Sequence, residues 1–153
     1  MRFSFILLGA GISNRFNSNI PKQYHKIAGK TLIDISINKI KEFKHIRRIV
    51  FVYNNKHKKY LKTIKQKNIK LVLGGTSRSQ STYNALKYLI KTKNTDRVLI
   101  HDAARPNFSK QLIKKNILKS KKNKTIIPVL KVRDVLKKIN KKKITSLQRN
   151  NFF

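Results

Sequence analysis

Apolar positions along this chain fall into short runs separated by longer segments with helical spacing. The apolar run Phe3–Leu8 predicts a buried strand directly after the N-terminus. Further strands are predicted at Arg48–Tyr53, Lys70–Leu73, Arg97–His101 and Thr125–Leu130, where β-branched and other apolar residues cluster. These five short segments fit the length of strands in a buried sheet.

Four segments between these runs have the 3.6-residue spacing of amphipathic helices. They are Thr31–Phe43, the lysine-rich Asn55–Gln66, Ser79–Lys91, and a segment that ends at Lys121 and begins after Ser109 as its N-cap. The side chains expected to face the core are Leu32, Ile33, Ile37, Ile40 and Phe43 in the first helix and Tyr83, Leu86, Leu89 and Ile90 in the third.

Strands that alternate with helices predict an α/β fold with a mostly parallel sheet and right-handed crossovers. The length of 153 residues suits a single domain, and neither a repeat nor an interdomain linker is visible. Lys131–Arg149 departs from the alternation, because Val132 and Val135-Leu136 flank Arg133-Asp134 and the basic turn Asn140–Lys143 follows. This last segment is expected to form a β-hairpin.

The charge of the chain is strongly unbalanced, with 38 Lys and Arg against 5 Asp and Glu and a formal net charge of +33. Such an excess is typical of nucleic-acid-binding proteins, which bind phosphates through clustered cations. Lysine here occurs on almost every predicted polar face, together with abundant Asn and Ile, as the coding bias of an AT-rich genome produces. The distribution favours compositional bias over a nucleic-acid partner, and it still attracts polyanionic ligands.

Cysteine is absent, which excludes disulfides and thiolate metal sites. The apolar runs are too short to cross a bilayer, so no membrane association is expected. The N-terminal run leads into a glycine loop and Arg15, where a signal peptide would have small residues for cleavage. We therefore expect a cytoplasmic protein.

In open parallel sheets, ligands bind beyond the carboxyl ends of the strands, and the first such loop here has the composition of a phosphate site. Gly9 and Gly11 allow a close backbone approach to an anion, while Arg15 and Lys22 add positive charge. The loop matches neither the dinucleotide fingerprint, because position 14 is Asn14, nor the Walker loop. The alternative is an ordinary turn with surface cations.

Two further strand-end segments are expected to share this site. Gly74–Ser81 joins a glycine pair to hydroxyl side chains, which suits a base or ribose, or alternatively a helix N-cap. Asp102 follows a predicted strand and precedes Arg105, so the carboxylate is suited to Mg²⁺ or a substrate hydroxyl. The alternative at this position is a local Asp–Arg ion pair.

The motifs IPKQY, GGTSRSQS and HDAARP, in this order after a GAG…R loop, resemble 2-C-methyl-D-erythritol 4-phosphate cytidylyltransferases from Phe3 to Phe153. The resemblance implies a Rossmann-like nucleotidyltransferase fold and a homodimer with residues 131–149 as dimer arm. It also implies Mg²⁺ as cofactor, and transfer of a cytidylyl group from CTP to methylerythritol phosphate with release of pyrophosphate, in nonmevalonate isoprenoid synthesis.

The same resemblance assigns roles to residues at matching positions. The implied catalytic residues are Arg15, Lys22 and Arg149, the last reached from the partner subunit. The implied CTP-binding residues are Ala10, Gly11, Ser13, Gly75, Thr76, Ser81 and Ala103, and those for the second substrate are Asp102, Arg105 and Val135, with Asp102 also a candidate Mg²⁺ ligand.

The chain departs from the family pattern at three places. Thr76 replaces a residue that is acidic in many relatives, and Val135 replaces a usual threonine, which removes one substrate contact. The Thr-Pro-Gln stretch and a late lysine of the family have no counterpart. We therefore expect a single domain, 1–153, that lacks its C-terminal part. Three alternatives remain: a ribitol 5-phosphate cytidylyltransferase, an inactive truncated remnant, and a basic nucleic-acid-binding protein.

Overall fold

The computed structural model describes residues 1–13, 16, 18–64, 69–140 and 143–147. The chain divides into two compact units, Met1–Ile113 and Lys114–Phe153. The division falls within helix α3 (Lys110–Ser120). The first unit holds the sheet and its two other α-helices, and the second holds a hairpin.

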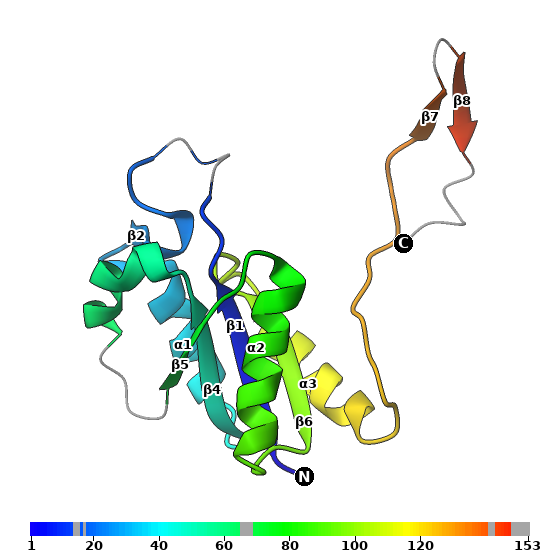
Figure 1. Ribbon diagram of the computed structural model, residues 1–153. Helices are drawn as coiled ribbons and strands as arrows, with labels where there is room; N and C mark the ends of the chain where they lie inside the picture. The colour runs from blue at the N-terminus through cyan, green and yellow to red at the C-terminus, as the bar shows by residue number, and fades with distance from the viewer. Residues whose placement is uncertain (14–15, 17, 65–68, 141–142, 148–153) are drawn as a thin grey trace. The chain divides into compact units, whose positions relative to one another are not determined.

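A four-stranded parallel sheet forms the centre of the first unit, in the order β5-β4-β1-β6. Its strands are β1 (Phe3–Gly9), β4 (Ile46–Tyr53), β5 (Ile69–Leu73) and β6 (Arg97–Asp102). Because all four run the same way, the loops that follow them leave from one end of the sheet, opposite the N-terminus (Figure 1). The predicted α/β class and parallel sheet are confirmed.

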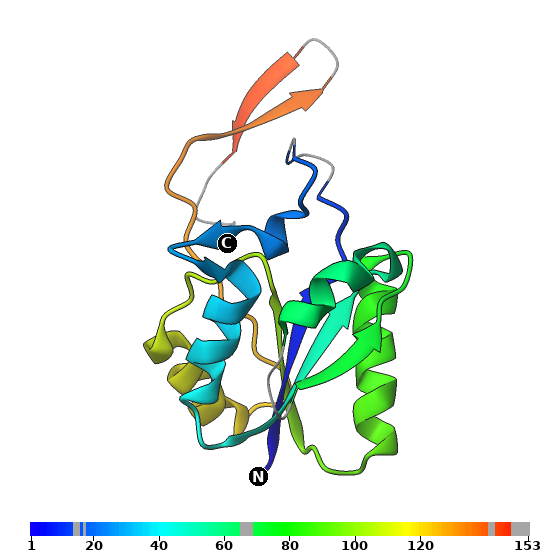
Figure 2. The same ribbon diagram turned by 90° about the vertical axis from the view of Figure 1, so that its left-hand side faces the viewer.

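Helix α1 (Leu32–Lys41) begins at a reciprocal capping box, in which the Asp34 N–H donates to the Thr31 hydroxyl oxygen at 3.1 Å. The Thr31 N–H in turn donates to the Asp34 carboxylate at 3.2 Å, so two unpaired donors of the first turn are satisfied. The helix lies on the face of the sheet opposite α2 (Figure 2). Its predicted inward positions are buried: Leu32, Ile33, Ile37 and Ile40, with Phe43 just after the helix.

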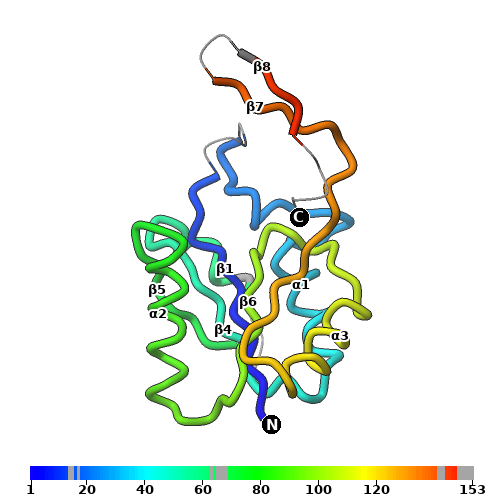
Figure 3. The backbone as a smooth tube through the Cα atoms, turned by 90° about the vertical axis from the view of Figure 1, so that its right-hand side faces the viewer, coloured from blue at the N-terminus to red at the C-terminus, as the bar shows by residue number. Residues whose placement is uncertain are grey.

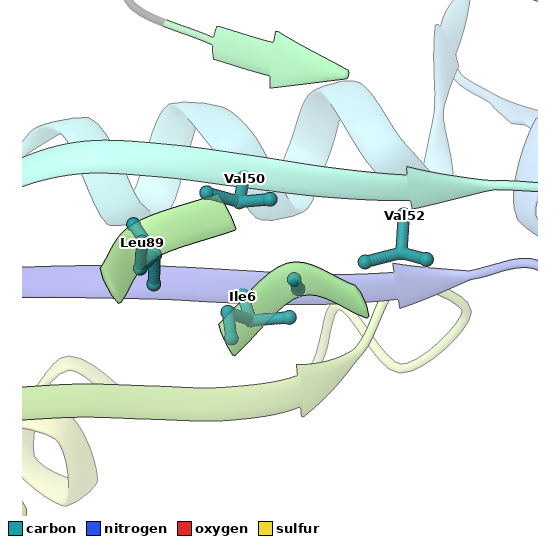
Figure 4. Packing of buried hydrophobic residues seen from close by; sticks show 5 residues of the cluster. Ile6, Val50, Val52 and Leu89 are labelled. Carbon is teal, nitrogen blue, oxygen red and sulfur yellow. The ribbon is translucent and has the colours of Figure 1, made fainter. Parts of the chain in front are cut away.

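Helix α2 (Arg78–Lys91) covers the other face of β1 and β4. Ile6, Val50, Val52 and Leu89 pack together with Ala85 between helix and sheet (Figure 4). The buried positions of α2 are Ser81, Ala85 and Leu89, which recur every four residues along one narrow face. Two inward predictions were therefore wrong, because Tyr83 and Ile90 lie off that face with 61% and 73% of their surface exposed.

Between β1 and α1 the chain forms the short 3₁₀ helix η1 (Lys22–Tyr24) and the paired strands β2 (Lys26–Ile27) and β3 (Lys30–Thr31). After β4 it forms the 3₁₀ helix η2 (Asn55–Thr63), where an α-helix through Gln66 was predicted. Residues 65–68 lie outside the described structure. The described part of this segment is therefore helical, as predicted, but in the tighter 3₁₀ geometry.

The second unit contains the hairpin of β7 (Leu136–Asn140) and β8 (Lys143–Leu147), drawn in Figure 3. Leu136 pairs with Leu147, and Ile139 pairs with Ile144, which confirms the predicted hairpin. The strand predicted at 125–130 is absent from the described residues, and Ile127, Val129 and Leu130 are 58–87% exposed. A run of apolar residues forms a strand only where it can pair with the edge of another strand. Within this unit, β7 and β8 pair with each other.

Among the described residues, none of the helices has both the length and the apolar composition needed to cross a membrane.

Candidate active site

A cleft of about 1080 Å³ opens at the carboxyl ends of the strands in the first unit. All three strand-end segments predicted to share one site contribute to its lining. The lining comprises residues 8–13, 16, 22–23, 54, 56, 75–78, 81, 102 and 104–105. The parallel topology thus places three segments around one cavity: the glycine loop that begins at Gly9, the hydroxyl-rich loop within Gly74–Ser81, and the turn from Asp102 to Arg105.

The glycine loop after β1 is held by the side chain of Gln23, which is 3% exposed. Its amide nitrogen donates to the carbonyl oxygens of Gly9 at 2.7 Å and Gly11 at 3.0 Å. The Ser13 hydroxyl donates to the Gln23 amide oxygen at 3.2 Å and accepts from the Lys22 N–H at 3.1 Å. These bonds lock the loop onto η1 and set the backbone of Lys22 beside it.

Asn54, the residue directly after β4, reaches the same loop from its neighbouring strand. Its amide nitrogen donates to the Ala10 carbonyl oxygen at 3.1 Å, and its amide oxygen accepts from the Lys56 N–H at 2.9 Å. The second bond is the N-cap of η2. One side chain therefore joins the start of η2 to the glycine loop.

The hydroxyl-rich loop packs directly against the glycine loop. A Cβ added to Gly74 would lie 2.5 Å from the Ala10 Cβ, so only glycine fits there without displacing the backbone. The Gly75 N–H donates to the Ser81 hydroxyl oxygen at 3.0 Å. Ser77 caps α2 by accepting from the Gln80 N–H at 3.0 Å, which confirms the helix N-cap considered for this segment.

Asp102, at the end of β6, is held between two arginines. Its Oδ1 accepts from Nε and Nη2 of Arg78, each at 3.3 Å, and its Oδ2 lies 3.3 Å from Nε of Arg105. The turn below is fixed by the Arg105 N–H, which donates to the Asp102 carbonyl oxygen at 3.1 Å. The Asp–Arg pair considered from the sequence is therefore present, with a second arginine added from α2.

The structure places most of the implied site residues in this cleft and leaves others elsewhere. Ala103 is fully buried beside it, and its N–H donates to the Leu8 carbonyl oxygen at 2.9 Å; its neighbour Ala104 lines the cleft instead. Val135 belongs to the second unit and is 70% exposed, while Arg15 and Arg149 lie outside the described residues. The lining includes Ala10, Gly11, Ser13, Lys22, Gly75, Thr76, Ser81, Asp102 and Arg105.

The charge of the cleft suits an anionic ligand. Four cationic side chains contribute to the described lining, against the single carboxylate of Asp102. Two of the four already contact Asp102, so Lys22 and Lys56 are the cations of the described lining with no ion pair to a described carboxylate. Positive charge around backbone groups that approach closely is the composition of a polyphosphate site.

Residues 3–152 match the family IspD, 2-C-methyl-D-erythritol 4-phosphate cytidylyltransferase. The chain belongs to this family. It is 44% identical over all 153 residues to the bifunctional enzyme IspD/IspF of Pelagibacter ubique (strain HTCC1062), and 43% identical over 122 residues to the 2-C-methyl-D-erythritol 4-phosphate cytidylyltransferase of Thermosipho melanesiensis. These matches confirm the resemblance that the motifs indicated.

The solved structures give the same result for the fold of this cytidylyltransferase-family chain. The 4-diphosphocytidyl-2C-methyl-D-erythritol synthase of Anaerococcus prevotii superposes over 97% of the chain with a TM-score of 0.81 and 28% identity. The chain spans 41% and 53% of the lengths of the two curated relatives named above, and 65% of that solved structure. The nucleotidyltransferase fold is therefore shown.

Three cleft residues were not predicted from the sequence, although the position of each one in the sequence pointed to the site. Asn54 directly follows β4, so the strand-end rule applied to that strand would have found it. Gln23 stands inside the IPKQY motif between two assigned neighbours, and Arg78 stands inside GGTSRSQS. Their partners are backbone carbonyls and a distant aspartate, and such contacts appear only when the loops meet in space.

No cluster of three or more His, Cys, Asp or Glu that could hold a metal ion is found in the described part of the chain. Mg²⁺ does not need such a cluster, because it usually binds one or two carboxylates and takes its remaining ligands from phosphates and water. Asp102 is a carboxylate of this kind in the cleft lining. The residues present therefore fit a Mg²⁺ ion that arrives with a nucleotide.

Proposed function

We propose that this chain transfers the cytidylyl group of CTP to 2-C-methyl-D-erythritol 4-phosphate and releases pyrophosphate, a step of nonmevalonate isoprenoid synthesis. The observation that carries the proposal is the meeting of three strand-end loops and Lys22 around one cationic cleft. Membership of the family supports the identity of both substrates.

In the proposed reaction, a phosphate oxygen of the alcohol phosphate attacks the α-phosphorus of CTP. A new P–O bond forms there, and the bond from the α-phosphorus to the oxygen bridging the β-phosphate breaks. Pyrophosphate leaves with that electron pair. Such transfer needs in-line placement of the reactants and cations where charge develops, rather than a nucleophilic side chain.

Lys22 is proposed to stabilise charge on the α-phosphate, because its backbone is fixed beside the glycine loop by Ser13. Gly75 and Ser81, joined by their own hydrogen bond, are proposed to face the cytosine and ribose together with Thr76. Asp102 is proposed to hold the methylerythritol moiety of the second substrate, with Arg105 beside it. Arg15 and Arg149, and the contributions of Ala103 and Val135, remain predictions from the family resemblance.

Mg²⁺ is the proposed cofactor, with Asp102 as its ligand from the chain. When bound, the ion would neutralise charge on the phosphate oxygens of the nucleotide. Both oxygens of Asp102 contact arginines, so a ligand at this carboxylate would compete with Arg78 or Arg105 for it.

The test is pyrophosphate release by the purified chain with CTP, Mg²⁺ and methylerythritol phosphate. Ribitol 5-phosphate in a parallel reaction tests the related substrate. Lys22→Ala and Arg15→Ala are expected to abolish release, because each removes a cation proposed to face the α-phosphate. Equal release from both variants and the unaltered chain would reject these roles, and release with ribitol 5-phosphate alone would reassign the substrate.

A homodimer formed through residues 131–149 in the cytoplasm is also proposed. Ile139 and Ile144 of the hairpin face each other across the strands and are 69% and 61% exposed, which leaves apolar surface for a second copy. Sedimentation equilibrium of the chain and of an Ile139→Glu variant tests this assembly. A monomeric unaltered chain would reject it.

A further inference from the structure

We infer that Gln23 and Asn54 act together as positioning residues that hold the glycine loop in the conformation that receives the triphosphate. The inference rests on the proposed function, because it concerns the same loop and the same ligand. Neither side chain needs to touch the nucleotide. Each acts through the backbone of the loop.

The observation is that three consecutive carbonyl groups of the loop each accept from a side-chain amide. The Gln23 amide donates to the carbonyl oxygens of Gly9 and Gly11, and the Asn54 amide donates to the carbonyl oxygen of Ala10 between them. The donor–acceptor distances are 2.7, 3.0 and 3.1 Å, all within the range of well-formed hydrogen bonds. The two amides come from different parts of the chain, η1 and the end of β4.

A hydrogen bond that fixes the direction of a carbonyl group also fixes the direction of the N–H group of the next residue. In a trans peptide the C=O of one residue and the N–H of the following residue lie in one plane and point in opposite directions. The bonds to Gly9 and Gly11 therefore direct the N–H groups of Ala10 and Ile12 away from Gln23. The bond to Ala10 directs the N–H of Gly11 away from Asn54.

Donors remain available in this loop. The N–H groups of Gly11 and Ile12 have no acceptor among the residues that the structure describes, and both residues line the cleft. A Cβ added to Gly11 meets no described atom within 4 Å, so space for a ligand lies beside the backbone. Oriented N–H groups beside open space form an anion-binding concavity.

The pattern differs from ordinary packing of a loop. Carbonyl oxygens exposed in a polyphosphate site would repel the ligand, whereas here each of the three is occupied by an amide donor. The loop thus presents donors to the cleft and directs its acceptors to Gln23 and Asn54. Preorganisation of this kind lowers the cost of binding, because the donors need not reorient when the anion arrives.

Asn54 allows a clean test, since its two bonds can be separated. Asn54→Asp and Asn54→Ser retain an oxygen that can cap η2 through the Lys56 N–H, and both lose the amide donor to Ala10, because Asp has no donor and the Ser hydroxyl is on a shorter side chain. Asn54→Ser adds no charge, so it separates the lost donor from repulsion of the nucleotide. Asn84→Asp is the matched control: the Asn84 amide also donates to a backbone carbonyl, that of Leu73 at 3.0 Å, but lies outside the cleft lining.

The measurement is the dissociation constant for CTP with Mg²⁺, by calorimetry at a salt concentration that suppresses nonspecific phosphate binding, together with KM for each substrate. Both Asn54 variants are expected to weaken CTP binding about tenfold, the loss expected for one hydrogen bond to an ordered ligand site. KM for the alcohol phosphate and the melting temperature should stay close to those of the unaltered chain. Asn84→Asp should leave the CTP constant within about twofold.

Failure of the inference and of the proposed function can be told apart. If the unaltered chain binds CTP and both Asn54 variants match Asn84→Asp, the positioning role is wrong and the proposed function stands. An equal rise of KM for both substrates would show a general structural effect and would also overturn the inference. If the unaltered chain binds no CTP, the proposed function fails and the inference fails with it.

Discussion

Arg78 and Asp102 are joined by an ion pair of 3.3 Å although they belong to segments at opposite edges of the sheet. Arg78 is the first residue of α2, after edge strand β5, and Asp102 ends edge strand β6. The contact therefore links the two outer loops of the cleft across the ends of β4 and β1. With Arg105 on the other carboxylate oxygen, the position of Asp102 is fixed from both sides.

Arg78→Gln is expected to reduce kcat/KM for the alcohol phosphate about tenfold while changing KM for CTP much less. The variant removes one of two cations that orient Asp102, and a lost charge-assisted hydrogen bond typically costs about 1.5–3 kcal/mol when the site is closed and less when it is exposed. Steady-state kinetics with each substrate varied in turn provides the measurement.

Arg2→Gln is the matched control for this prediction, because Arg2 and Asp96 form a similar exposed pair at 2.8 Å, where Arg2 precedes β1 and Asp96 precedes β6. It should leave both kinetic constants unchanged. A loss of activity in Arg2→Gln equal to that in Arg78→Gln would show that the effect is one of general charge rather than of position.

Gly74→Ala should lower the stability of the folded chain, whereas Gly11→Ala should leave it unchanged. A Cβ at Gly11 meets no described atom, so the melting temperature should not change, whereas CTP binding should weaken because the methyl group occupies ligand space. A Cβ at Gly74 lies 2.5 Å from the Ala10 Cβ and 3.2 Å from the Tyr53 carbonyl oxygen. Overpacking at such a site costs about 1–3 kcal/mol of folding stability.

Thermal unfolding and CTP calorimetry on the two variants measure these effects. Unchanged CTP affinity in Gly11→Ala would contradict a close approach of the nucleotide to this loop. An unchanged melting temperature in Gly74→Ala would show that the two loops are not packed as described.

Stability should fall as the pH drops through the range where His57 titrates. His57 is buried against Tyr24 and Tyr60, and burial lowers the pKa of His57 from its ordinary value of 6.5. The unfolded chain therefore binds a proton more readily than the folded chain. The stability from neutral His57 is complete above about pH 6.5 and decreases below it.

His57→Phe removes this titration while keeping a ring against Tyr24. The decrease in melting temperature between pH 7 and pH 5 should accordingly be smaller in the variant than in the unaltered chain, as differential scanning fluorimetry would record. Equal decreases in both proteins would mean that His57 is not the group responsible.

The sequence predicted those parts of the fold that depend on local pattern. The inward residues of α1 were correct because four apolar side chains share one face of the helix that follows the Thr31 cap. Tyr83 and Ile90 were wrongly assigned to the core, since a narrow contact with the sheet leaves part of the apolar surface of α2 outside. The strand predicted at 125–130 needed a partner edge, which no local pattern reveals.

The site, like the fold, could be predicted only where it depends on local sequence. Gly11, Lys22, Gly75 and Asp102 could be placed in one cleft because strand-end loops of a parallel sheet converge. The roles of Gln23, Asn54 and Arg78 depend on contacts between loops that are distant in sequence, such as the 44 residues that separate Asn54 from Ala10. Composition and spacing carry no information on such pairs.

Cytidylyl transfer by this chain is tested most directly by a ³¹P NMR spectrum of the chain incubated with CTP, Mg²⁺ and methylerythritol phosphate. We expect the triphosphate resonances of CTP to be replaced by pyrophosphate and by the two coupled resonances of a diphosphate diester, with no conversion in Lys22→Ala. Unchanged CTP, or orthophosphate with CDP in place of these products, would contradict cytidylyl transfer by this chain.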